Sequence, residues 1–250
     1  MKSTTSGVTR RELFALAGLA GASALLPNAA FAEDGAIAPM TEEPPNPERM
    51  LMSIPEPEVS TLAVNPTWAQ SSLGSGAKTF LDGNGDTYLN PALKVIDVSE
   101  HNGTIDWSAV KKAGVDGAII RLGFGNTRTD YQLANNVSSC EKLGIPYGVY
   151  LYSYAYNTDL AEEEAVFTAK VLSERGYEPS LPIFYDLEEW VWTGHTPPTT
   201  VSAYEAIVRR YCDVLKARGY GNVRVYSYRN YLNTVLKSDY IWERAAWAAE

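Results

Sequence analysis

The sequence contains few of the residues from which metal sites and disulfides are built. It has two cysteines and two histidines in 250 residues. Cys140 and Cys212 each stand on the apolar side of a predicted helix, so we expect both to be buried and unpaired, with a disulfide as the alternative. A zinc site needs clustered Cys and His ligands, and the sequence has no such cluster. We therefore predict no metal and no cofactor.

Positive charge is also scarce. Lysine and arginine number 21 against 30 acidic residues, which gives a net charge of −9. Nucleic-acid binding depends on basic side chains that neutralise phosphates. The chain has no basic tract, so we expect no nucleic-acid partner. Binding to an anionic wall polymer would have to rest on sugar contacts rather than on charge.

The sequence lacks a long hydrophobic run. An apolar stretch over residues 13–26 is too short and too rich in Gly and Ala for a stable membrane anchor. Arg10 and Arg11 precede it and Ala30-Phe31-Ala32 follows, which predicts a signal peptide over residues 1–32. The paired arginines favour the twin-arginine route, with an ordinary secretory signal as the alternative. We therefore expect a protein that is secreted or held in the cell wall.

Two segments separate this leader from the main domain. Residues 33–60 are too rich in Pro and Glu to pack, and they predict an extended, mobile linker. Residues 61–91 form an extension with a hairpin around the turn at residues 82–86. The acids of that turn resemble the start of a calcium loop, but Leu93 stands where the loop requires a glutamate.

From residue 92 onward, predicted strands alternate with predicted helices. We expect strands at residues 93–99, 117–123, 146–154, 181–188 and 223–228 and near Ala245. Helices are expected to start at Asp106, Asp159 and Ser202, each of which can cap a helix. This alternation predicts an α/β fold with a parallel sheet. The pattern alone does not separate a closed barrel from an open sheet.

Three carboxylates stand on predicted strands. Asp186 and Glu188 share one strand face, with Cα atoms roughly 6 to 7 Å apart. Two carboxylates that close repel each other, so one tends to hold its proton, as in the acid pair of a glycoside hydrolase. Asp97 lies within another apolar run, where an acid is costly unless it faces a polar cavity. The alternative for the Asp186–Glu188 pair is a cap on the next loop.

Six ordered blocks resemble glycoside hydrolase family 25, the N-acetylmuramidases or Chalaropsis-type lysozymes. The blocks are residues 96–103 with 105–107, 117–123, 143–150, 182–188, 225–227 and 246–248. The resemblance covers roughly residues 92–250 and implies a TIM-like (β/α) barrel. Family members continue past the last block to a final pair of strands. Because this chain ends at Glu250, the resemblance implies an incomplete barrel. We expect a fragment of a longer protein, with a defective product as the alternative.

The resemblance also implies an activity. It is hydrolysis of the β-1,4 bond between N-acetylmuramic acid and N-acetylglucosamine in peptidoglycan, with retention of configuration. Glu188 would be the proton donor. Asp186 would steady the acetamido group of the substrate as that group attacks, or would itself be the nucleophile. Asp97 would be the third acid, next to the charge or the sugar.

Five further residues are expected to bind substrate beside the acids. They are Tyr152, Tyr154, Trp190, Tyr226 and Arg121. Aromatic rings with a polar tip suit the faces of sugars, with core packing as the alternative for each ring. Arg121 can hold an acid by a bidentate pair or form a salt bridge on the outer, helix-covered face.

Two other functions stay open from the sequence. One is a wall-binding module without catalysis. The other is a glycosidase acting on another N-acetylated glycan such as chitin, although the longer acidic run of family 18 chitinases is absent before Asp186. The partner we expect is the glycan strand of peptidoglycan, bound by a monomer.

Overall fold

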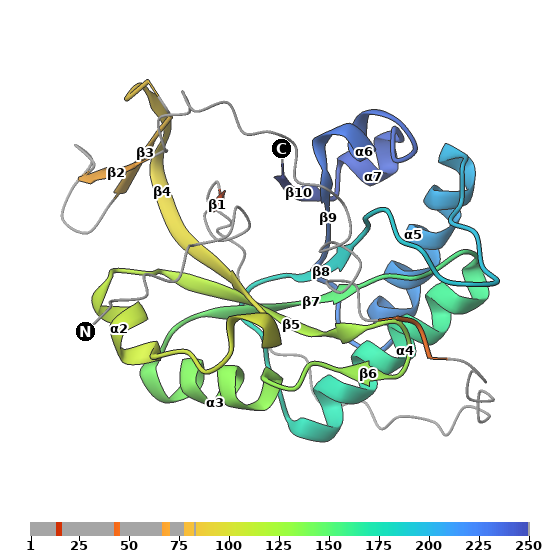
Figure 1. The fold of residues 1–250 in the computed structure, drawn as a ribbon, viewed down its shortest axis with the longest axis horizontal. Coiled ribbons are helices and arrows are strands. Elements are labelled where there is room, and N and C mark those ends of the chain that lie inside the picture. Colours follow the sequence, from red (N-terminus) through yellow and green to blue (C-terminus); the bar gives the residue numbers. More distant parts are fainter. Residues whose placement is uncertain (1–13, 17–42, 46–66, 71–77, 83, 250) are drawn as a thin grey trace.

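The computed structural model of this protein describes residues 14–16, 43–45, 67–70, 78–82 and 84–249 (Figure 1). The predicted signal peptide and linker therefore lie almost entirely outside the described residues. Within the described part of the chain, no helix is both long and apolar enough to cross a membrane.

Strands and helices alternate from residue 87 onward. The main strands are β4 (Thr87–Val98), β5 (Gly117–Phe124), β7 (Tyr147–Tyr152), β8 (Ile183–Asp186), β9 (Val223–Tyr228) and β10 (Ala245–Ala249). The longer helices between them are α2 (Trp107–Lys112), α3 (Leu133–Leu143), α4 (Thr158–Arg175) and α5 (Val201–Ala217). Two short helices, α6 (Arg229–Asn233) and α7 (Asp239–Trp242), connect β9 to β10. The predicted order of strands is confirmed.

The six main strands run parallel, in the order β10-β9-β8-β7-β5-β4. Each strand is joined to the next by a segment that contains at least one helix, which is the connection that parallel strands require. The result is a mixed α/β fold with a curled sheet. The expected TIM-like barrel is not confirmed, because the sheet is an open, curled wall and closure from β10 to β4 is not seen among the described residues.

A small antiparallel extension continues the sheet beyond β4 (Figure 1). It consists of β2 (Thr67–Gln70) and β3 (Lys78–Leu81), and β3 forms with β4 the hairpin expected from the sequence. Strand β4 begins at Thr87, earlier than the predicted residue 93. Lys78 Nζ lies 2.6 Å from Asp116 Oδ1, so an ion pair joins the extension to the parallel sheet.

Two further short strands pair with this sheet. β1 (Phe14–Leu16), which falls within the predicted leader, pairs antiparallel with residues 93–95 of β4. β6 (Arg128–Thr129) pairs antiparallel with the end of β5. The turn into β6 is tight, because a Cβ at Gly123 would lie 1.9 Å from the carbonyl oxygen of Arg128. Only glycine fits that position without a shift of the backbone.

The two faces of the parallel sheet bury different cores. The outer face packs against the helices and is apolar, with Ile120, Leu151 and Val225 among its members (Figure 1). The other face carries a separate cluster to which each parallel strand contributes one residue. These are Val95, Ile119, Tyr150, Phe184, Tyr226 and Trp247. Strands buried on both faces explain why the sequence reads as continuous apolar runs.

Two helix starts differ from the prediction. The cap of α4 is Asn157, whose side chain accepts from the amide of Leu160, rather than Asp159. The cap of α5 is Thr200 rather than Ser202. Asp106 caps α2 as predicted, with its carboxylate accepting from Ala109.

Both cysteines are buried and free, as predicted. Burial raises the pKa of the Cys140 thiol to about 12, and the charge of Glu141 adds to the effect. A thiol with so high a pKa is protonated at neutral pH and is a poor nucleophile.

Candidate active site

Two of the predicted acids lie on the sheet face that the helices do not cover. Asp97 is two residues beyond Val95 on β4, and Asp186 is two residues beyond Phe184 on β8. Because alternate residues of a strand share a face, both carboxylates stand on the face of the second core cluster. Both also lie at the carboxyl ends of their strands, the edge where parallel α/β folds carry active sites.

Glu188 stands just past the end of its strand. β8 ends at Asp186, so the predicted strand over residues 181–188 is too long and the alternation argument reaches Asp186 only. The chain nevertheless continues alongside β9. The Leu187 amide donates to the carbonyl of Tyr226 at 3.0 Å, and the Ser227 hydroxyl donates to the Leu187 carbonyl. These bonds fix the backbone immediately before Glu188.

All three acids are buried. The exposed fraction is 7% for Asp97, 1% for Asp186 and 1% for Glu188. A buried carboxylate favours its protonated form, and a nearby like charge has the same effect. Such surroundings are those in which enzymes keep one carboxyl group protonated at neutral pH.

The Tyr154 hydroxyl interacts electrostatically with one predicted acid, Glu188, and with the charged residues Arg121 and Glu164. Burial raises the pKa of its hydroxyl, Arg121 opposes that rise, and the charges of Glu164 and Glu188 add to it. The Tyr154 hydroxyl therefore lies within electrostatic reach of Glu188. It donates to the carbonyl of Pro45, so the described residues 43–45 lie against this part of the domain.

Aromatic rings gather at the end of β7 and beyond the ends of β7 and β8. The Tyr154 ring lies 5.3 Å from Tyr152, 5.6 Å from Trp190 and 5.9 Å from Trp192, centroid to centroid. The Tyr152 hydroxyl donates to the carbonyl of Glu189 at 3.1 Å. The structure thus brings Tyr152, Tyr154 and Trp190 together, and all three are buried as they stand.

Tyr226 belongs to the core cluster on the same sheet face. It is the register neighbour of Asp186, and its ring lies 4.3 Å from that of Trp247. The ring packs within a buried layer, as expected from core packing, the alternative to substrate binding for this ring. Its backbone carbonyl holds Leu187, so Tyr226 supports the segment that carries Glu188.

Arg121 is fully buried and engaged by two acids. Its Nε lies 2.7 Å from Asp130 Oδ2, and its Nη2 lies 3.3 Å from Glu100 Oε1. Its place on β5, two residues beyond Ile119, puts it on the inner face with the predicted acids. The structure therefore supports the predicted ion pairing, with partners that the sequence did not identify.

A buried glutamate, Glu164, completes the surroundings of the site. It lies on α4 and accepts from the amide of Tyr154 at 2.7 Å, from Ser153 Oγ at 2.8 Å and from Tyr185 Oη at 2.6 Å. Sequence reasoning missed it. The available signal was its spacing, four residues after Leu160 in the apolar stripe of α4, where an acid is unexpected.

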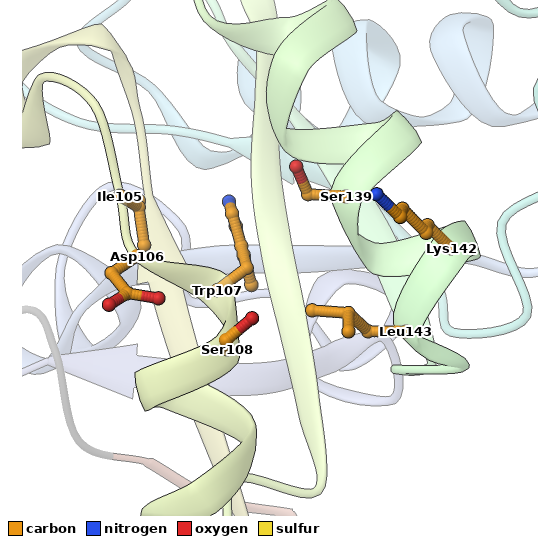
Figure 2. Close-up of a pocket in the computed structure, with 7 residues that line it drawn as sticks. All are labelled: Ile105, Asp106, Trp107, Ser108, Ser139, Lys142 and Leu143. Carbon is orange, nitrogen blue, oxygen red and sulfur yellow. The ribbon is translucent and has the colours of Figure 1, made fainter.

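One surface pocket of about 260 Å³ lies elsewhere, between α2 and α3 (Figure 2). Trp107, Ser139 and Lys142 contribute to its lining, and none of its lining residues is a predicted site residue. Among the described residues, no group of three or more His, Cys, Asp or Glu side chains is placed to hold a metal ion.

Comparison with known proteins identifies relatives of this chain. The sequence profile of the glycosyl hydrolases family 25 matches residues 96–250, well over half of the chain. An autolytic lysozyme of Clostridium acetobutylicum is 27% identical over 154 residues, which are 60% of this chain and 44% of that protein.

Solved structures similar to this chain are also found. The modular autolysin LytC from Streptococcus pneumoniae, solved alone and with a synthetic peptidoglycan ligand, is 32% identical with a TM-score of 0.60. The match covers 72% of this chain and 49% of that one. The bacterial lysozyme from Streptomyces coelicolor shares the fold at 20% identity and a TM-score of 0.51, over 63% of this chain and 74% of that one. The chain thus spans about half the length of LytC and less than half of the clostridial lysozyme.

Proposed function

This chain belongs to the glycosyl hydrolases of family 25, and on that basis we propose that it is a peptidoglycan hydrolase. The bond cleaved is the β-1,4 linkage between N-acetylmuramic acid and N-acetylglucosamine. Two relatives support the substrate, since one is an autolytic lysozyme and the other was solved with a synthetic peptidoglycan ligand.

One observation carries the proposal. Asp97, Asp186 and Glu188 are buried carboxylates at the carboxyl ends of β4 and β8, in the part of the chain that matches the family. Burying one acid is costly, and burying three near one sheet edge is costlier still. Buried acids of this kind are typical of a site in which a carboxyl group must hold or accept a proton during the reaction.

Glu188 is the proton donor in the proposed hydrolysis. It gives a proton to the oxygen of the leaving sugar as the glycosidic bond breaks. The hydrogen bonds of Leu187 to β9 fix the backbone that presents Glu188 to the site. A fixed donor is worth more than a mobile one, because the reacting atoms are already close.

Asp186 acts on the other side of the scissile bond. In the substrate-assisted route it steadies the acetamido group of the substrate while the oxygen of that group attacks the anomeric carbon. In the direct route the carboxylate of Asp186 itself attacks. Both routes involve two displacements and retain the configuration of the sugar. Asp97 lies on the same sheet face and stabilises the positive charge that develops on the sugar.

Tyr152, Tyr154 and Trp190 form the adjoining aromatic wall, and Arg121 holds the polar side of the site through its acidic partners. The curled sheet is the wall of a TIM-like barrel of the family 25 type. The chain acts outside the cytoplasm, as a monomer on glycan strands, after export by the leader over residues 1–32. No cofactor takes part.

The test is digestion of purified peptidoglycan by the full chain, with Glu188→Gln as the blank. New reducing ends are labelled by borohydride reduction and identified by mass spectrometry. Reduced muramic acid at the new ends is the expected result. Reduced glucosamine would show a different bond specificity.

Two further outcomes would contradict the proposal. Sedimentation with the wall but no new reducing ends would indicate a binding module. Digestion of chitin in preference to peptidoglycan would indicate a glycosidase for another N-acetylated glycan.

A further inference from the structure

We propose that Glu164 is a positioning residue of this site, which holds the ends of β7 and β8 in the arrangement that the catalytic acids need. The inference rests on the proposed hydrolysis and assigns a role to a residue on the outer side of the sheet. Glu164 itself does not contact the reacting atoms.

The contacts of Glu164 join two strand ends. Its Oε1 accepts from the backbone amide of Tyr154, just past β7. Its Oε2 accepts both from Ser153 Oγ, also past β7, and from Tyr185 Oη on β8. Three donors therefore converge on one carboxylate. Two of these donors, Ser153 Oγ and Tyr185 Oη, also lie 2.9 Å from each other.

The groups that Glu164 holds are neighbours of the site. Tyr185 directly precedes Asp186, and the Ser153 amide donates to the carbonyl of Asp186 at 2.9 Å. The Tyr154 ring contacts Trp190, and its hydroxyl lies in the field of Glu188. A small displacement of these strand ends would therefore move Asp186 and the aromatic wall together.

The location of this carboxylate is costly for folding. Glu164 is fully buried, and its donors are two neutral hydroxyls and one peptide amide rather than a cation. A buried charge without an opposite charge destabilises the folded state, and a glutamine of the same shape would avoid that cost. Residues that break a stability rule in this way are concentrated at functional sites.

Protonation of Glu164 would weaken this arrangement. Burial raises its pKa to about 7, against the opposing effects of its three hydrogen bonds, and the charge of Glu163 raises it further. The other titratable groups that face it are Tyr154, Tyr185 and Tyr211, whose pKa values are all raised by burial. These tyrosines stay neutral at neutral pH, so Glu164 is the member of this group that changes charge there.

The two ionisation states differ in how firmly they hold the donors. The carboxylate accepts three hydrogen bonds, and bonds to an ionised acceptor are about twice as strong as neutral ones. A protonated Glu164 must instead donate from one oxygen, so at least one hydroxyl has to rotate away. We therefore assign the working arrangement of the strand ends to the ionised form.

The experiment compares the wild-type chain with Glu164→Gln, which imitates the protonated form without a change of shape. At pH 8 we expect kcat on purified peptidoglycan to fall about 10- to 100-fold in the variant, with KM nearly unchanged. At pH 5 the two rates should converge, because wild-type Glu164 is then protonated as well. The matched control is Glu174→Gln, an exposed glutamate of the same helix, which should behave as wild type at both pH values.

Near-ultraviolet circular dichroism provides a readout that does not depend on activity. The wild-type spectrum should change with a midpoint near pH 7, and Glu164→Gln should show no such transition. Tyr185→Phe removes one donor to the carboxylate, so its midpoint should move to higher pH. This second variant decides the matter if Glu164→Gln does not fold.

Three results would overturn the assignment. They are wild-type kcat in Glu164→Gln at pH 8, a wild-type spectrum without the transition, and a melting temperature at pH 8 that falls in step with kcat. The last result would reveal a general loss of structure rather than a positioning role. If wild-type protein releases no reducing ends, the proposed hydrolysis fails, and the spectra alone then decide the role of Glu164.

Discussion

Arg121 and Asp130 form a buried ion pair, with Nε 2.7 Å from Oδ2 and both side chains at most 1% exposed. Asp130 Oδ2 also accepts from the amide of Glu100 at 2.9 Å. Glu100 belongs to the short segment that follows Asp97 and Val98 at the end of β4. The pair therefore links the centre of β5 to the chain immediately after a predicted catalytic acid.

Removal of Arg121 should mainly cost stability. Arg121→Met leaves Asp130 buried without its cation, and breaking a buried pair in this way typically costs about 3 to 5 kcal/mol. Asp130→Leu combined with Arg121→Met should cost less than the sum of the single variants, because no charge of the pair is then left behind. Urea unfolding of the wild type, the two single variants and the double variant measures the coupling free energy between Arg121 and Asp130. A different result would indicate direct substrate binding by Arg121. In that case the effects of the two substitutions on stability would be additive, and Arg121→Met would raise KM without a change in stability.

Replacement of Glu188 should abolish turnover and leave the fold intact. Glu188→Gln removes only the transferable proton, and a general acid is typically worth about 10² to 10⁴ in rate. Release of reducing ends from peptidoglycan measures the loss, and circular dichroism verifies the fold. More than half of the wild-type rate would reject Glu188 as the donor.

Asp186→Asn should also reduce the rate strongly. The amide keeps the shape but neither attacks the sugar nor stabilises a positive charge, so both routes fail. A loss of only a few-fold in kcat would show that Asp186 is a bystander. Product analysis of the residual activity by proton magnetic resonance reports whether the first sugar formed has the retained configuration.

Much of the fold could be predicted from local sequence patterns. Runs such as residues 181–186 are apolar and bounded by turns, so each parallel strand could be recognised alone. The exact ends of strands and helices were harder to predict. Asn157 and Asp159 are both able to cap α4, and the extended backbone at Asn157, with φ −152° and ψ 176°, decides between them.

The site could be predicted only in part, for a related reason. Asp97 and Asp186 break apolar runs and so draw attention without any knowledge of the fold. Asp130 lies in an ordinary polar segment, and nothing local shows that it meets Arg121. Glu164 meets Tyr185 across 21 residues of chain. Contacts made by tertiary packing have no local signature, so the partners of both acids were missed, although the place of Glu164 in the apolar stripe of α4 marks it as unusual.

Export can be tested independently of catalysis. Arg10→Lys combined with Arg11→Lys keeps the charge of the leader but removes the arginine pair that the twin-arginine route requires. We expect the variant to remain inside the cells of the native host, as measured by immunoblots of medium, wall and cytoplasm. Normal secretion of the variant would indicate the general secretory route.

Glu164 should also make the stability of the protein depend on pH. Its pKa rises from 4.5 in the unfolded chain to about 7 in the folded protein. Between these values the folded state binds a proton that the unfolded state releases, so stability falls as the pH rises through this window. The stabilising contribution is complete below pH 4.5 and is lost above pH 7, with a total on the order of 3 kcal/mol.

Glu164→Gln has no proton to lose, so its advantage over wild type should grow with pH. We expect the difference in unfolding free energy between variant and wild type to increase by about 2 to 3 kcal/mol from pH 5 to pH 8. Urea unfolding at the two pH values measures it, with Glu174→Gln as the exposed control. The same difference at both pH values would show that Glu164 has an ordinary pKa in the folded protein. If instead the advantage grows while kcat at pH 8 falls, the buried carboxylate lowers stability and serves the arrangement of the site.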